Sequence, residues 1–202
     1  AFAHAGQICM SSARILVEAP IARPFAEALA QRAAQLKLGD LRDPETAYGP
    51  LINERAVAKV DGQVREAREA GAEILTGGHV HKGLTYAPTV LFEPDRSLGV
   101  WTQETFGPVA SVMPVNDLDE AVRLANDSAF GLSAGVLTND MKRGLTAARR
   151  LRVGSVHVGS HSFHSDALAP IGGFGLSSLG RSGGKYSIEH FTELKWISVS
   201  LD

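Results

Sequence analysis

Apolar residues in this chain follow two spacings, one typical of strands and the other typical of helix faces. Residues Arg14–Ala19 are mostly apolar and β-branched, which predicts a strand ending before Pro20. Beyond it, apolar positions recur at helical spacing as far as Gly39: Phe25, Leu29, Ala33 and Leu36. The first unit is therefore predicted to be a strand followed by an amphipathic helix.

The alternation of strand and helix continues along most of the chain. Short apolar runs predict further extended segments: Ala72–Thr76, Tyr86–Phe92, Val109–Val115, Ser133–Leu137 and Ser155–Val158. Apolar positions at helical spacing predict helices between several of them: Val57–Ala67, Leu118–Ala125 and Met141–Leu151. Leu41–Leu51, with two prolines and Gly49, is predicted to be a loop, and Gly77-Gly78 is typical of a turn.

Two aspartates are suited to begin helices. Asp117, followed three residues later by Glu120, resembles a capping box, and Asp140 can cap the next helix. The face of that last helix expected to be buried comprises Met141, Leu145, Ala148 and Leu151.

Successive strands separated by helical segments cannot pair as hairpins and need crossover connections. The sequence therefore predicts a doubly wound α/β fold with a mainly parallel sheet and helices on both faces. The end of the chain differs, because Gly172–Gly184 is predicted to be flexible coil and Ser187–Glu193 a short helix. Trp196–Leu201 alternates like a strand that projects from the body. We expect one domain over residues 1–194 and a C-terminal strand over residues 195–202.

The composition is that of an ordinary globular domain. The chain has 202 residues, of which 44% are hydrophobic, enough for one substantial core. The formal net charge is −2 and the basic residues are scattered, so neither nucleic acid nor an anionic membrane is an expected partner. The chain has no apolar run of the roughly 20 residues that a membrane span needs and no signal-peptide pattern, so we expect a cytoplasmic protein. Because it begins with Ala1 rather than Met, we expect a fragment.

Cys9 is the only cysteine, which excludes an internal disulfide and a cysteine metal cluster. A buried, inert thiol is one interpretation, since free cysteine packs as a small hydrophobe. The neighbouring Gly6, Gln7, Ser11 and Ser12 instead suit a turn that exposes the thiol. Cys9 is therefore a candidate nucleophile.

The segment Gln103–Val109 places Glu104 and Phe106 two residues apart just before a predicted strand. Residues at that spacing in extended chain share a face. A carboxylate there could accept hydrogen bonds from a ribose diol while the ring packs on a flat heterocycle. A surface glutamate beside a core phenylalanine would explain the pattern equally well.

Two other features could carry chemistry but fit no established pattern. The glycine-rich stretch from Gly172 follows a loop rather than a strand, so it matches no nucleotide-binding fingerprint. His157, His161, His164 and Asp166 could ligate a metal, yet their spacing matches no common ligand pattern. We therefore predict neither a phosphate cradle nor a metal site.

Three motifs, in this order and at similar separations, resemble the aldehyde dehydrogenase superfamily: Gly6–Ser11, Gln103–Val109, and Pro170–Gly173 continuing to Gly180-Arg181. Within it, Gln7–Ser11 and Phe191–Ile197 look most like the benzaldehyde, vanillin and salicylaldehyde dehydrogenases, which implies an aromatic aldehyde as substrate. The resemblance covers only the family's C-terminal catalytic domain. It implies that the N-terminal cofactor domain, the general-base glutamate and the oxyanion-hole asparagine are absent.

The resemblance also implies a chemistry. The Cys9 thiolate adds to the aldehyde, the resulting thiohemiacetal passes a hydride to NAD or NADP, and the thioester is hydrolysed to the acid. Glu104 would bind the nicotinamide ribose, Phe106 would line the nicotinamide side of the site, and the final strand would join an oligomerisation sheet in a homo-oligomer. Without the cofactor domain, the isolated chain is expected not to oxidise aldehydes.

Some positions depart from the family's pattern. Ile171 stands where an aromatic residue is usual, Ser178 where a glycine often follows serine, and Gly159 where asparagine is common. The exchange at Ile171 affects the side of the site where substrate would lie.

Two other functions stay open from the sequence. The fragment could be an assembly module that pairs through its C-terminal strand, because an unpaired strand edge templates association. Cys9 could also act as a cofactor-free esterase, because an exposed thiol can be acylated by an activated ester.

Overall fold

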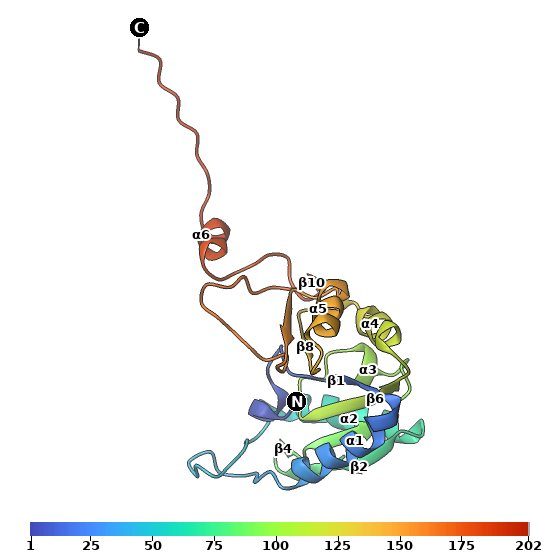
Figure 1. Cartoon of the computed structure of the whole chain (residues 1–202). Coiled ribbons are helices and arrows are strands. Elements are labelled where there is room, and N and C mark those ends of the chain that lie inside the picture. Colours follow the sequence, from blue (N-terminus) through green and yellow to red (C-terminus); the bar gives the residue numbers. More distant parts are fainter. Residues whose placement is uncertain (202) are drawn as a thin grey trace.

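Two parallel strands that are far apart in the sequence lie side by side in the main sheet. In the computed structural model, which describes residues 1–201, the strand order is β1 (Arg14–Glu18), β6 (Val109–Val115), β5 (Thr89–Phe92) and β2 (Glu73–Thr76). β6 pairs in parallel with both β1 and β5, whereas β2 pairs antiparallel with β5. The predicted mainly parallel α/β fold is confirmed (Figure 1).

The connection between β2 and β5 explains the antiparallel strand. It contains no helix, only the turn at Gly77-Gly78, where φ is +73° and +76°, and a small hairpin of β3 (Val80–Lys82) and β4 (Thr85–Tyr86). A parallel pair needs a crossover, which this connection does not supply, so the chain returns antiparallel.

Helices cover both faces of this sheet, as predicted. Because successive residues of a strand point to opposite faces, Val90 packs with the α1 helix (Ala19–Ala34) and Leu91 with the α2 helix (Glu54–Glu69). The fully buried side of α1 is made of alanines: Ala22, Ala26, Ala30 and Ala33. The predicted Phe25 and Leu29 are only partly buried, because small residues let the helix lie close to the sheet.

Strand β1 ends one residue earlier than predicted. Ala19 and Pro20 belong to the first turn of α1, where the missing N–H of proline removes no hydrogen bond.

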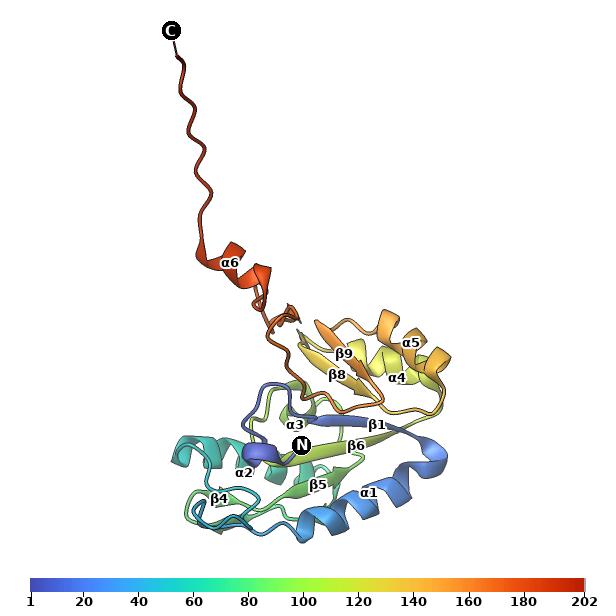
Figure 2. The same ribbon diagram turned by 60° about the vertical axis from the view of Figure 1, so that its left-hand side comes forward.

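A second unit of parallel strands stands beside β1 (Figure 2). The parallel strands β8 (Ser133–Val136) and β9 (Ser155–Val158) are joined by α5 (Met141–Arg150), and α4 (Leu118–Asn126) leads into the unit. Its short antiparallel pair consists of β7 (Phe130–Gly131) and β10 (Phe174–Gly175). The strands of the α/β fold are thus divided between separate sheets.

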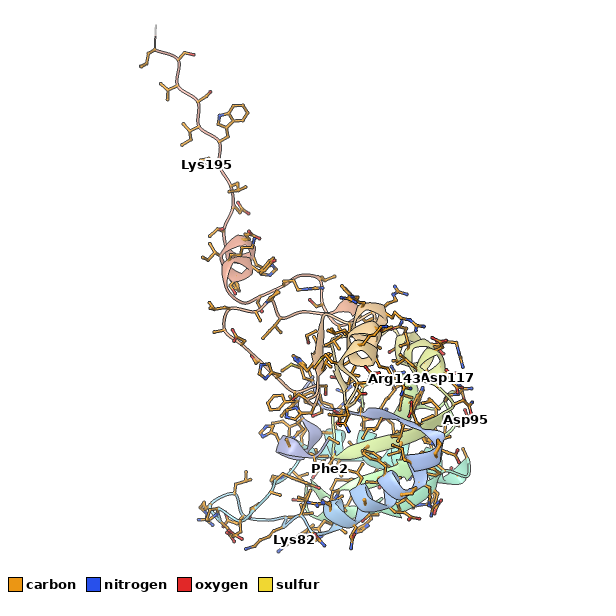
Figure 3. The ribbon with its side chains drawn as sticks, in the orientation of Figure 1. Phe2, Lys82, Asp95, Asp117, Arg143 and Lys195 are labelled. Atoms are coloured by element: carbon orange, nitrogen blue, oxygen red, sulfur yellow. The ribbon has the colours of Figure 1, made fainter. Side chains whose placement is uncertain are left out.

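The two predicted helix caps are confirmed. The Asp117 carboxylate accepts from Glu120 N at 2.8 Å, and that of Asp140 accepts from Arg143 N at 3.0 Å. Glu120 itself accepts from Asn116 N rather than from Asp117 N. Arg143 also forms an ion pair with Glu18 at the end of β1, which ties α5 to the main sheet; Asp117 and Arg143 are both labelled in Figure 3.

The prediction of which face of α5 is buried is wrong. Met141 is 62% exposed and Leu145 43%, whereas Gly144 and Ala147 are buried. A Cβ at Gly144 would lie 2.6 Å from a methyl of Val158, so the helix approaches β9 at its smallest residue. The buried face of α5 is therefore set by a glycine, which lets β9 come close, and not by a row of apolar side chains.

The C-terminal segment projects from the body, as predicted, but forms no strand in the single chain. After α6 (Lys185–Phe191), residues 192–201 are extended and exposed, with Trp196 91% exposed. Figure 3 shows their side chains, with Lys195 labelled, standing clear of the other elements. A strand needs a hydrogen-bonded neighbour, and these residues have none in the described part of the chain. Asp202 lies outside the described residues.

Over residues 1–201, no helix combines the length and the apolar character of a membrane span.

Candidate active site

Cys9 lies on an exposed turn, so the interpretation as a buried thiol is wrong. The turn spans Ile8–Ser11 between the short 3-10 helix η1 (Ala3–Gly6) and β1. It is closed by one backbone hydrogen bond, in which Ser11 N donates to Ile8 O at 2.9 Å. No backbone acceptor contacts Cys9 N within residues 1–201. Cys9 is therefore exposed, and its N–H is without a backbone acceptor in the described residues.

The parallel pairing of β1 and β6 brings the Cys9 turn to the segment that carries Glu104 and Phe106. Each precedes the amino end of its strand, and Ser111 N donates to Ala13 O at 2.8 Å where the pair begins. Neighbouring parallel strands have their amino ends at the same edge of the sheet, so the two loops meet there.

A contact between two glycines holds these loops together. Gly6 is buried with φ +69°, and a Cβ placed on it would lie 2.0 Å from Gly107 O. Only glycine permits both this conformation and this approach. The backbones of the two loops are thus in direct contact, close to Cys9 on one side and to Phe106 on the other.

Strained backbone gathers at the same place. In the described chain, three of the four non-glycine residues with positive φ border this site: His4 (53°), Ala5 (55°) and Phe106 (53°). Each left-handed residue costs about 1–2 kcal/mol, so the surrounding contacts must hold these conformations. Backbone strain of this kind is found preferentially at functional sites.

Gln7 anchors the turn to a distant loop. Its Oε1 accepts from Ile52 N at 2.9 Å, and its Nε2 donates to Pro50 O at 3.4 Å. The sequence indicated only that Gln7 supplies an amide near the thiol. Its partners lie more than 40 residues away, and no local pattern identifies them.

The side chains of Glu104 and Phe106 are available to a ligand. The Glu104 carbonyl accepts from Lys59 Nζ, whereas its carboxylate is exposed and takes part in no ion pair or hydrogen bond among residues 1–201. Phe106 is 40% exposed, which rules out the interpretation as a core phenylalanine. The loop is thus fixed through its backbone while its carboxylate and ring stay free.

Arg14, a residue that the sequence did not single out, connects the segment before Glu104 to the end of α4. Its guanidinium lies 5.2 Å from the centre of the Trp101 ring, on the short α3 helix (Gly99–Thr102) that leads to Glu104. It donates to Ala125 O at 2.9 Å and to Asp127 O at 3.3 Å, at the end of α4. Burial lowers the pKa of Arg14, opposed by the charge of Asp127.

The histidines form a small aromatic group, and no three His, Cys, Asp or Glu side chains gather as metal ligands in the part of the chain that the structure describes. The rings of His157 and His164 meet edge to face at 5.2 Å, and His161 stacks on Phe163 at 6.2 Å. Nε2 of His157 is buried without a hydrogen-bond partner in residues 1–201. Burial, with smaller contributions from His164 and His161, lowers the pKa of His157.

The glycine-rich stretch serves close packing. A Cβ on Gly154 would lie 1.6 Å from Gly172 O, and Arg181 donates to Gly173 O at 2.9 Å. Hollows of ≈ 290 Å³ beside α1 and β2, and of ≈ 50 Å³ beside β7, lie away from Cys9.

Gly6→Ala is expected to separate the two loops, because the added methyl overlaps Gly107 O and φ is left-handed. Overpacking of this kind costs about 1–3 kcal/mol, measurable by urea unfolding. The control is Gly62→Ala in α2, where a Cβ meets nothing within 4 Å. It should be neutral or stabilise by up to about 1 kcal/mol. Equal free energies of unfolding for the two variants would contradict the contact between Gly6 and Gly107.

The lowered pKa of His157 predicts acid sensitivity. In the unfolded chain its pKa returns to about 6.5, so below that pH the unfolded state binds the proton first. The free energy of unfolding should therefore decrease as the pH falls from about 8 to about 5.5. His157→Gln should reduce this decrease in urea titrations, whereas the same exchange at the exposed His81 should leave it unchanged. Identical pH dependences of wild type and His157→Gln would refute the assignment.

Comparison with known proteins supports the resemblance found in the sequence. Residues 1–197 match the aldehyde dehydrogenase family. The chain is 41% identical over 199 residues to benzaldehyde dehydrogenase [NAD(+)] from Pseudomonas putida and 38% identical over 199 residues to vanillin dehydrogenase from Pseudomonas fluorescens. Each match covers 98% of this chain and 41% of the relative. The chain thus spans about two fifths of the length of these relatives.

The structure is similar to solved structures of the same family. A betaine aldehyde dehydrogenase from Staphylococcus aureus, solved in complex with NAD+, matches with a TM-score of 0.89 and 33% identity, covering 97% of this chain and 42% of that one. The HpcC protein from Thermus thermophilus matches with a TM-score of 0.91 and 35% identity, covering 96% and 39%. The relatives include the benzaldehyde and vanillin dehydrogenases that the sequence resembles, and this chain belongs to the aldehyde dehydrogenase family.

Proposed function

We propose that this chain is the thiol-bearing catalytic part of an NAD(P)-dependent aldehyde dehydrogenase, with Cys9 as its nucleophile. One observation carries the proposal: the exposed Cys9 turn is in backbone contact, through Gly6 and Gly107, with the loop that bears Glu104 and Phe106. A nucleophile and a set of groups suited to a nucleoside thus occupy one edge of the sheet.

The Cys9 thiolate adds to the carbonyl carbon of the aldehyde, which forms a C–S bond and places a negative charge on oxygen. The free N–H of Cys9 can stabilise that charge by a hydrogen bond. NAD(P)+, when bound, supplies the acceptor for the hydride that leaves the same carbon. The carbonyl then re-forms as a thioester on Cys9, and water hydrolyses it to the carboxylic acid and the free thiol.

Glu104 and Phe106 fit the nicotinamide half of such a cofactor. A carboxylate accepts hydrogen bonds only, and that of Glu104 is unpaired among residues 1–201, which suits a ribose diol. The exposed Phe106 ring offers an apolar surface for a flat heterocycle. The relative from P. putida is named for NAD(+) and a succinate-semialdehyde dehydrogenase from Escherichia coli for NADP(+), so the proposal names the cofactor class.

The described residues supply no partner for the thiol. No carboxylate or imidazole forms a hydrogen bond with Cys9 Sγ within residues 1–201. We therefore assign the general base and most of the cofactor binding to the part of the relatives that this chain does not span. Residues 1–194 form the thiol-bearing domain in this proposal, and residues 195–202 a strand for a homo-oligomer, supported by the exposure of Trp196, Ile197, Val199 and Leu201. A cytoplasmic location stays a prediction.

An aromatic aldehyde is the proposed substrate class. The identity is 41% to the benzaldehyde dehydrogenase from P. putida and 37% to a glutarate-semialdehyde dehydrogenase from the same species. Ile171, which replaces the family's usual aromatic residue, is held by backbone hydrogen bonds of 2.6 and 2.9 Å to Ser182. Backbone pairing therefore sets the path of the chain at Ile171, whichever side chain stands there.

The chain by itself is expected to form no NADH from benzaldehyde and NAD+, because no base contacts the thiol. When the chain replaces the corresponding two fifths of the P. putida enzyme, the fusion protein should form NADH, measured by its absorbance. Cys9→Ala should abolish turnover in this fusion, and Glu104→Gln should raise the KM for NAD+ about tenfold or more, the loss expected from charge-assisted hydrogen bonds.

Steady turnover by the isolated chain would contradict the assignment of the general base to the part of the relatives that this chain does not span. A fusion that binds NAD+ but keeps full activity in Cys9→Ala would refute the role of Cys9. Lys37→Ala, which removes an exposed charge that pairs with Asp43 in the loop after α1, is the matched control that should leave activity unchanged.

A second candidate function, cofactor-free ester cleavage, is favoured by the exposure of Cys9. An activated ester can acylate the thiol without hydride transfer. The isolated chain should release a burst of nitrophenol from p-nitrophenyl acetate, and the burst should vanish in Cys9→Ala. Identical traces for the two proteins would exclude this chemistry.

A further inference from the structure

Ser162 is a buried hydroxyl in a segment whose neighbouring side chains are exposed. The residue is 5% exposed, whereas His161 and Phe163 on either side face solvent. The segment lies tightly on β8, because a Cβ at Gly135 would be 2.6 Å from Ser160 O and 2.9 Å from Ser162 N. Ser162 is thus held in place by the second unit of the fold.

A hydrogen bond from β8 completes this placement. Ser133 Oγ donates to Ser162 O at 2.6 Å. With the close approach at Gly135, the backbone of Ser162 is restrained on two sides. Its hydroxyl therefore has a defined position relative to β8 and β9.

The hydroxyl reaches the Cys9 turn. Ser162 Oγ donates to Met10 O at 2.6 Å and shares a second hydrogen bond, of 2.8 Å, with Ser12 Oγ. A hydroxyl has one proton to donate, so the bond to Met10 uses it and Ser12 is the donor in the second. Both partners lie directly after Cys9, 150 or more residues before Ser162.

The Cys9 turn needs restraint from outside. Its own structure contributes one backbone hydrogen bond, from Ser11 N to Ile8 O. The Gly6–Gly107 contact and Gln7 restrain the chain before Cys9, and Ser162 restrains the chain after it. A turn clamped on both sides presents its thiol and its N–H in one orientation.

We propose that Ser162 is a positioning residue that holds the Cys9 turn in its reactive geometry through the Met10 carbonyl. The proposal rests on the proposed function in one respect, that Cys9 is the nucleophile. It adds a dependence of Cys9 chemistry on the β8–β9 unit, through a buried residue whose hydroxyl is bonded to the chain that follows Cys9.

Hydrogen exchange tests the clamp without any assay of activity. In Ser162→Ala, the amide of Ser11, which donates to Ile8 O, should exchange about tenfold faster, as the loss of one buried hydrogen bond allows, while β5 and β6 stay protected. Ser12→Ala, which keeps the bond from Ser162 to Met10, should change the rate less than about threefold. Ser162→Thr retains a hydroxyl and should restore slow exchange.

Unchanged exchange in Ser162→Ala, or equal acceleration in Ser12→Ala, would overturn the proposal. Should Ser162→Ala fail to fold, Ser133→Ala loosens the same segment from β8 and should accelerate exchange of the Ser11 amide by a smaller factor. No acceleration there would overturn it as well.

Two reagents for Cys9 separate positioning from general structural damage. Alkylation by iodoacetamide needs only an accessible thiolate, whereas acylation by p-nitrophenyl acetate also needs an oriented N–H for the oxyanion. In Ser162→Ala, acylation should fall about tenfold and alkylation less than about twofold, with Ser162→Thr close to wild type. Equal loss in both reactions would assign Ser162 a merely structural role. If wild type shows no acylation, the ester-cleavage function fails, and hydrogen exchange still decides the role of Ser162.

Discussion

The contact between Gly6 and Gly107 is the constraint on which the candidate active site depends. Cys9 is three residues after the first glycine and Glu104 three residues before the second, so the contact determines how the thiol stands relative to the carboxylate. Sterics maintain it: the left-handed φ of Gly6 and the 2.0 Å approach of its missing Cβ leave no room for another residue. Backbone contacts therefore position the two loops, and the side chains of the site depend on that placement.

The main sheet supplies the frame for that contact. Because β1 and β6 run parallel and adjacent, the loops before them emerge at the same edge, and no active-site side chain is needed to bring them together. The sheet is rigid because each face is packed, Val90 against α1 and Leu91 against α2. Burial of the strands thus stabilises the positions of two exposed loops.

Polar side chains then hold the loops in their strained conformations. Gln7, Ser162 and Arg14 each bond to backbone groups of distant segments rather than to other side chains alone. Such bonds fix the path of the chain while the candidate site groups, the Cys9 thiol and the Glu104 carboxylate, stay unpaired within residues 1–201. This division fits a site whose nucleophile must be presented in one orientation yet remain accessible.

The sequence by itself determined the longer helices and strands, the α/β class, the family, and the two motifs that meet at the site, because spacing, caps and short motifs are local properties. It failed where contact between distant residues decides. The buried face of α5 is centred on Gly144 rather than on Met141 and Leu145, because β9 approaches where no side chain stands. Trp196–Leu201 has the pattern of a strand but forms none in the single chain, since pairing needs a neighbour. Only the tertiary structure revealed that Ser162 reaches the Cys9 turn, because a hydrogen bond across 152 residues leaves no trace in local sequence.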